Sequence, residues 1–198
     1  MIKTNKCAIY GGTFDPIHNG HLHVIKELIR TDDFDKFIVV PSGTPAQKSA
    51  IATAEQRFEM TTLAVAQAIG NEPRIEVADF EVKRPGISFA IDTANEVSKK
   101  YPKHEIYWVI GSDALSNIKT WHQFSELSKI IKFLVIERPG FAESDIPAGL
   151  NYEFRKIAAK NISASEIRNH ISAGEDISDE IPSSVIDFIN RNGLYGAA

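Results

Sequence analysis

The chain has almost no cysteine, no long apolar run and no strong excess of charge of either sign. The single cysteine, Cys7, excludes an intramolecular disulfide and fits a reducing cytoplasm. No segment approaches the roughly 20 apolar residues of a membrane span, and the N-terminus lacks the plan of a signal peptide. The net charge of −4 argues against a nucleic-acid binder held by bulk charge. We therefore expect a cytoplasmic protein with no membrane or nucleic-acid partner.

The length of 198 residues and the apolar content of 43% suit one domain with a sizeable core. Apolar runs alternate with segments of helical periodicity, which predicts an α/β fold. We expect a Rossmann-like, doubly wound parallel sheet of five to six strands with helices on both faces. The expected strands are residues 7–10, 37–41, 74–78, 105–111 and 132–137, with a possible sixth at 154–159. The helical part from about residue 162 is predicted to pack on the same domain, 1–198.

The most informative stretch is residues 10–22, YGGTFDPIHNGHL, between the first expected strand and the first expected helix. In a parallel sheet such a turn offers backbone N–H groups and a helix N-terminus to an anion. Gly11 and Gly12 would let a phosphate approach the backbone closely. His18 and His21 are three residues apart, so they share one helical face. The alternatives are a glycine turn with two surface histidines, or part of a metal site that needs further ligands.

Polar residues also follow two later strands, at the edge where open α/β sheets bind ligands. Lys48 lies in the loop after the second strand and is a candidate phosphate ligand, although a solvated lysine fits the spacing equally well. Gly111 and Asp113 follow the strand at 105–111. The Asp113 carboxylate could accept hydrogen bonds from a ribose diol or cap the next helix.

Two further side chains stand out against their surroundings. Arg57 lies in the first turn of an expected helix, where a cation is disfavoured by ~0.3–1 kcal/mol. It therefore indicates a specific partner, with an exposed salt bridge as the alternative. Trp121 has polar neighbours and is a candidate stacking platform for an aromatic ring. The alternative is a packing residue against Phe124 and Leu127.

A second candidate anion site lies in residues 162–168, ISASEIR. Ser163 or Ser165 is expected to begin a helix, with Arg168 one turn further on. Serine hydroxyls, backbone N–H groups and a guanidinium at one helix start suit an anion. The alternative is an ordinary helix cap.

Together these motifs resemble a known family. GGTFDPIHNGH resembles the [ST]-F-D-x-x-H-x-G-H signature of the nucleotidyltransferase superfamily of adenylyl- and cytidylyltransferases, and ISASEIR resembles its I-S-S-T-x-x-R signature. Residues 84–93, 111–115 and 138–140, with Trp121, resemble the bacterial nicotinate mononucleotide adenylyltransferases. One departure is Gln47, where that family usually has histidine, so no phosphate role is predicted for this position.

The resemblance implies transfer of AMP from ATP to nicotinate mononucleotide in NAD biosynthesis, with Mg²⁺ carried by ATP and a possible homo-oligomeric state. It assigns catalytic roles to His18, His21, Lys48 and Arg168, and it predicts no metal ligands. The residues implied in ATP binding are Gly11, Gly12, Thr13, Phe14, Gly111, Asp113, Arg138, Ser163 and Ser165. Those implied in mononucleotide binding are Thr93 and Trp121. The alternatives are a superfamily transferase acting on phosphopantetheine or nicotinamide mononucleotide, and a non-catalytic nucleotide-sensing module.

Overall fold

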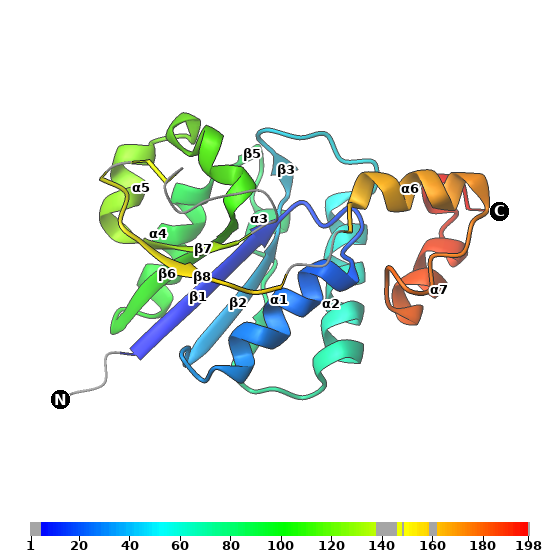
Figure 1. Ribbon diagram of the computed structural model, residues 1–198. Helices are drawn as coiled ribbons and strands as arrows, with labels where there is room; N and C mark the ends of the chain where they lie inside the picture. The colour runs from blue at the N-terminus through cyan, green and yellow to red at the C-terminus, as the bar shows by residue number, and fades with distance from the viewer. Residues whose placement is uncertain (1–4, 138–145, 148, 159–161, 198) are drawn as a thin grey trace.

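Six parallel strands form the central sheet of the computed structural model, which describes residues 5–137, 146–147, 149–158 and 162–197 (Figure 1). In chain order the strands are β1 (Asn5–Gly12), β2 (Lys36–Pro41), β4 (Ile75–Val77), β6 (His104–Gly111), β7 (Lys132–Ile136) and β8 (Tyr152–Arg155). They lie side by side in the order β4-β2-β1-β6-β7-β8. The order reverses between β1 and β6, which is where a doubly wound sheet opens a ligand crevice. The predicted fold class is confirmed, and the sixth strand begins two residues earlier than expected.

Helices cover both faces of this sheet (Figure 1). On one face lie α1 (Asn19–Arg30), α2 (Ala54–Ile69), α6 (Ala164–Ala173) and α7 (Ser183–Arg191). On the other lie α4 (Ala90–Lys100), the 3₁₀ helix η1 (Ser112–Thr120) and α5 (Phe124–Ile130). Successive strand side chains point to opposite faces, so Cys7 and Ile9 join one buried cluster while Ala8 joins the other. Both faces are therefore buried, which explains the unbroken apolar runs of the strands.

Four short elements lie outside the central sheet and its main helices. β3 (Thr44–Pro45) pairs in parallel with β5 (Ile87–Ser88) in a separate two-stranded sheet. The Ser88 hydroxyl also accepts a hydrogen bond from the Gly43 N–H at 2.9 Å. The helix α3 (Phe80–Lys83) precedes β5, and a last 3₁₀ turn, η3, spans Leu194–Gly196. Within the described ranges, no helix combines the length and apolar character needed to cross a bilayer.

The C-terminal helices share the core of the sheet. Ile167 of α6 and Ile189 of α7 belong to the same buried cluster as Leu22 of α1 and Met60 of α2. Burial of this kind couples the unfolding of the parts that share it. We therefore expect the sheet and the C-terminal helices to unfold together as one cooperative unit.

We expect Ile189→Ala to lower the free energy of unfolding by about 2–5 kcal/mol, because truncating a fully buried isoleucine leaves a cavity. In urea, far-UV circular dichroism and tryptophan fluorescence should give one common midpoint. Trp108 and Trp121 report from the opposite face, so fluorescence tests whether both layers unfold together. Ile130→Ala, at a position 38% exposed, is the control and should cost about 1 kcal/mol or less. Two separate midpoints would contradict a single cooperative domain.

Candidate functional site

The loop between β1 and α1 lies at the carboxyl edge of the sheet, where the strand order reverses. β1 ends at Gly12, and α1 begins at Asn19 with His18 as its N-cap residue. The loop thus presents a helix N-terminus at the crevice, as the sequence predicted for an anion site.

The structure brings the two predicted histidines together. The rings of His18 and His21 stack with their centroids 3.6 Å apart and their planes 26° apart. The backbone N–H of His18 donates to Nδ1 of His21 at 3.3 Å. Because Nδ1 accepts, the proton of a neutral His21 ring lies on Nε2, which makes that nitrogen a donor. In the described part of the chain, no group of three or more His, Cys, Asp or Glu side chains is arranged to hold a metal ion.

The two glycines at the end of β1 are required by neighbouring aromatic rings as well. A Cβ at Gly12 would lie 2.6 Å from the ring of Phe14, and one at Gly11 would lie 2.9 Å from the ring of Trp108. Both distances are shorter than a normal carbon–carbon contact. The Phe14 ring is itself buried and meets the His21 ring edge-on, with centroids 5.0 Å apart. A ligand contact from Phe14 would therefore come from its backbone.

Asp15 carries a carboxylate that is only 3% exposed, within the same loop. Its Oδ2 accepts a hydrogen bond from the N–H of Ile51 at 2.7 Å, and its Oδ1 accepts one from the N–H of Ala52 at 3.1 Å. Oδ1 also accepts a bond from the hydroxyl of Tyr195 at 2.7 Å. Since a buried carboxylate requires such donors, Asp15 holds the loop to the segment just before α2 and to the C-terminal turn.

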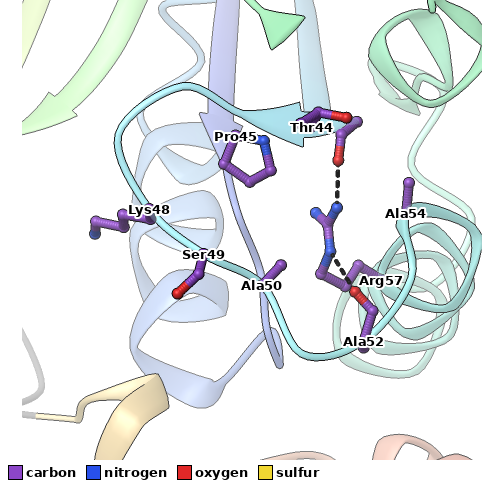
Figure 2. A pocket seen from close by; sticks show the side chains of 9 residues that line it. Thr44, Pro45, Lys48, Ser49, Ala50, Ala52, Ala54 and Arg57 are labelled. Carbon is purple, nitrogen blue, oxygen red and sulfur yellow. Dashed lines mark hydrogen bonds between the residues drawn. The ribbon is translucent and has the colours of Figure 1, made fainter. Parts of the chain in front are cut away.

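Arg57 is buried beside this loop and confirms the expectation of a specific partner. Its Nη1 donates to the carbonyl of Thr13 at 2.7 Å, and its Nη2 donates to that of Gly43 at 2.6 Å. Its Nε donates to the carbonyl of Ala52 at 3.2 Å (Figure 2). Burial lowers the pKa of Arg57, but the side chain stays charged at neutral pH because the usual pKa of arginine exceeds about 12. The guanidinium thus joins three segments through backbone carbonyls.

The second predicted motif, residues 162–168, contacts the first motif, residues 10–22. Ser163 is the N-cap residue of α6, and Ser165 lies exposed in the first turn. Nη1 of Arg168 donates to the backbone carbonyl of Asp15 at 2.8 Å, and its Nη2 donates to the Ser165 hydroxyl at 3.2 Å. Two motifs about 150 residues apart in the chain therefore meet at one loop.

On the other side of the crevice, the positions of the residues after β6 agree in part with the roles predicted from the sequence. Gly111 ends β6, and Asp113 is exposed in the first turn of η1. Trp121 is half-buried, with its ring edge-on to Trp108 at 6.2 Å and to Phe133 at 6.3 Å between centroids. Trp121 therefore packs in the cluster that includes Leu127 and Phe124, and its stacking on a ligand ring stays a prediction.

Thr93, a predicted mononucleotide-binding residue, is buried in α4. Its side chain is 0% exposed, and its hydroxyl donates to Oε1 of Glu81 at 2.7 Å. It also accepts from Nη1 of Arg84 at 3.3 Å. Burial raises the pKa of Glu81, and the Thr93 hydroxyl opposes this shift by stabilising the charged carboxylate. The Thr93 hydroxyl is thus buried against a protein carboxylate, and its role in mononucleotide binding, near the carboxylate of the pyridine ring, stays a prediction.

A surface pocket of about 400 Å³ lies in the segment between β2 and the first turn of α2 (Figure 2). It is lined by Gly43, Thr44, Pro45, Lys48, Ser49, Ala50, Ala52, Ala54 and Arg57. Lys48 is exposed, and its side chain points away from Arg57 across the loop. Gln47 beside it is exposed as well. Arg138, a predicted ATP-binding residue, lies outside the described residues.

Three residues of this site had no assigned role in the sequence. Asp15 could have been noticed from the sequence, because it is the one acidic residue in residues 10–22, a motif that turns before a helix. Glu81 lies in a charged segment that gave no sign of burial. Tyr195 gave no signal either, because it is 180 positions from the carboxylate that it contacts.

The family model, the relatives and the solved structure that resemble this chain are all nucleotidyltransferases. The family model described as Cytidylyltransferase-like matches residues 9–170. A "Probable nicotinate-nucleotide adenylyltransferase" of Clostridium tetani is 36% identical, over 96% of this chain and 98% of the relative. One of the same name from Thermus thermophilus is 32% identical, over 96% and 99%. The fold matches a solved Plasmodium falciparum nicotinic acid mononucleotide adenylyltransferase complexed with NaAD, with a TM-score of 0.80, 24% identity and 98% coverage of both chains.

We expect Arg57→Lys to lower the free energy of unfolding by at least about 2 kcal/mol, because an ammonium cannot reach the three carbonyls and leaves buried acceptors unsatisfied. Urea denaturation measures the change. Arg30→Lys is the matched control, since Arg30 is exposed and should change stability by less than about 0.5 kcal/mol. Equal stabilities of the two variants would show that the carbonyl contacts of Arg57 contribute little.

Proposed function

Because this chain belongs to the cytidylyltransferase-like family, among its nicotinate-nucleotide adenylyltransferases, we propose that it transfers AMP from ATP to nicotinate mononucleotide. The products are deamido-NAD and pyrophosphate, which places the reaction in NAD biosynthesis. ATP enters with its Mg²⁺ as one substrate, since Mg²⁺ is usually held by few protein ligands and the substrate phosphates. A cytoplasmic location fits the single cysteine of the sequence.

The observation that carries this proposal is the contact between Arg168 and the backbone of Asp15. It sets a guanidinium and the N-terminus of α6 next to the stacked histidines at the N-terminus of α1. Two helix N-termini and a cation directed at one crevice suit a polyphosphate.

The chemistry needs no general base from the protein. A phosphate oxygen of nicotinate mononucleotide, anionic at neutral pH, attacks the α-phosphorus of ATP and forms a new P–O bond. The bond from the α-phosphorus to the bridging oxygen breaks, and pyrophosphate leaves with that electron pair. The protein must hold two anions together and stabilise the charge that gathers on the leaving group.

We assign the charge stabilisation to three side chains. His21 donates through Nε2 to the α-phosphoryl group, with His18 keeping its ring oriented through the stack and the Nδ1 contact. Within the described residues Arg168 uses two of its five N–H groups, and the others can donate to the pyrophosphate. Lys48 is exposed on its loop and can move to the same phosphates.

The remaining assignments concern binding. The N-terminus of α6, with Ser163 and Ser165, holds the β- and γ-phosphates, and the backbone of residues 11–14 lines the nucleotide cleft. Gly111 and the exposed Asp113 carboxylate take the adenosine ribose. The half-buried Trp121 offers its exposed part to the pyridine ring.

Pyrophosphate release from MgATP with three acceptors tests the proposed function. We expect strong preference for nicotinate mononucleotide over nicotinamide mononucleotide, and no release with phosphopantetheine. Comparable use of the amide would indicate a dual-specificity enzyme. Release with phosphopantetheine alone would identify another branch of the superfamily, and no release with any acceptor would favour a nucleotide-sensing module.

We expect His21→Ala to lower kcat by at least ~10²-fold, the scale of losing one donor to the transition state. Initial rates of pyrophosphate release at saturating substrates measure this loss. His23→Ala is the matched control, because it removes an imidazole from the same helix two residues further on and should leave kcat within about twofold. Near-normal turnover of a folded His21→Ala variant would remove His21 from the mechanism.

A further inference from the structure

We propose that Tyr195 is a positioning residue for this reaction. Its hydroxyl donates to the Asp15 carboxylate, and Asp15 lies in the loop that leads into α1, the helix that carries His21. The inference rests on the proposed adenylyl transfer and adds to it a residue in the last turn of the described chain, outside both sequence motifs.

The bond between Tyr195 and Asp15 is short and buried. The hydroxyl donates to Oδ1 at 2.7 Å, and Tyr195 is 8% exposed. Burial and the Asp15 carboxylate raise the pKa of Tyr195, so the hydroxyl keeps its proton and remains a donor at neutral pH. The other two donors to this carboxylate are backbone N–H groups of residues 51 and 52, so Tyr195 supplies the one side-chain hydroxyl among them. Its removal leaves a lone pair of a buried carboxylate unsatisfied.

The backbone is strained on both sides of this bond. Phe14, which precedes Asp15, has φ = +50°, and Tyr195 has φ = +59°. A left-handed conformation is unfavourable for a residue with a Cβ, because the Cβ approaches the following carbonyl oxygen. Such conformations persist where the surrounding contacts determine them, and they concentrate at functional sites. The hydrogen bond from Tyr195 to Asp15 joins these two strained segments.

The strained loop is in direct contact with the groups assigned to the chemistry. The Phe14 ring meets the His21 ring edge-on at 87°, and Arg168 donates to the carbonyl of Asp15. A shift of Asp15 therefore displaces a histidine and an arginine at once. Small displacements of positioned groups reduce the rate of a reaction that depends on positioning. We expect the effect in kcat rather than in KM, because both groups act mainly on charge that develops in the transition state.

The test compares Tyr195→Phe with Tyr107→Phe in the full chain. Tyr107 is the matched control because it is buried and its hydroxyl bonds two carboxylates, Glu153 at 2.9 Å and Glu105 at 3.0 Å, that belong to neither motif. With MgATP and nicotinate mononucleotide, Tyr195→Phe should lower kcat about tenfold and keep both KM values within about twofold. Tyr107→Phe should keep kcat within about twofold. Near-UV circular dichroism and thermal melts establish that both variants are folded.

A double-mutant cycle with Asp15→Asn separates positioning from general stabilisation. If Tyr195 acts through Asp15, the double variant should be no more than about twofold slower than Asp15→Asn alone. Multiplied losses, or equal kcat values for Tyr195→Phe and Tyr107→Phe, would overturn the inference. An inactive wild-type protein would instead refute the proposed function, so the two failures are distinguishable.

Discussion

A carboxylate taken out of water must be given hydrogen-bond donors, and this requirement at Asp15 organises the site. The donors come from the segment just before α2 and from the C-terminal turn, while the carbonyl of the same residue accepts from Arg168 on α6. One residue of the β1–α1 loop therefore determines where three other segments of the chain lie. The loop can hold an unfavourable backbone conformation at Phe14 because Asp15, the residue after it, is so firmly bound.

Arg57 complements this arrangement with the opposite charge. It is buried next to the same loop, yet its hydrogen bonds go to carbonyl groups of Thr13, Gly43 and Ala52. Its positive charge is thus spread over backbone dipoles, while Asp15 receives N–H and O–H donors. With Arg168 nearby, the two cations outnumber the one carboxylate in the loop. Fixed positive charge and helix N-termini, set before any substrate arrives, are what transfer between two phosphate-bearing molecules requires.

Several features were accessible from sequence because they depend on neighbours along the chain. The spacing of His18 and His21 predicted a shared face, and their rings are stacked. The poor match between Arg57 and a helix N-terminus predicted a specific partner. Thr93 shows the limit of this reasoning, since helical spacing gives the face of a residue relative to its helix but not what packs there. Glu81, twelve residues earlier in the chain, packs there and accepts a hydrogen bond from the buried Thr93 hydroxyl.

The sequence by itself determined the succession of the main strands and helices along the chain, the turn that brings a helix N-terminus to the sheet edge, and the family. These follow from periodicity, glycine and proline placement, and motifs, all of which act over short stretches of chain. Only the tertiary structure decided that Asp15 meets Arg168 across 153 positions and Tyr195 across 180. Hydrogen bonds depend on atoms lying about 3 Å apart, and that closeness is set by the packing of α6 and the last turn against the sheet rather than by any local pattern.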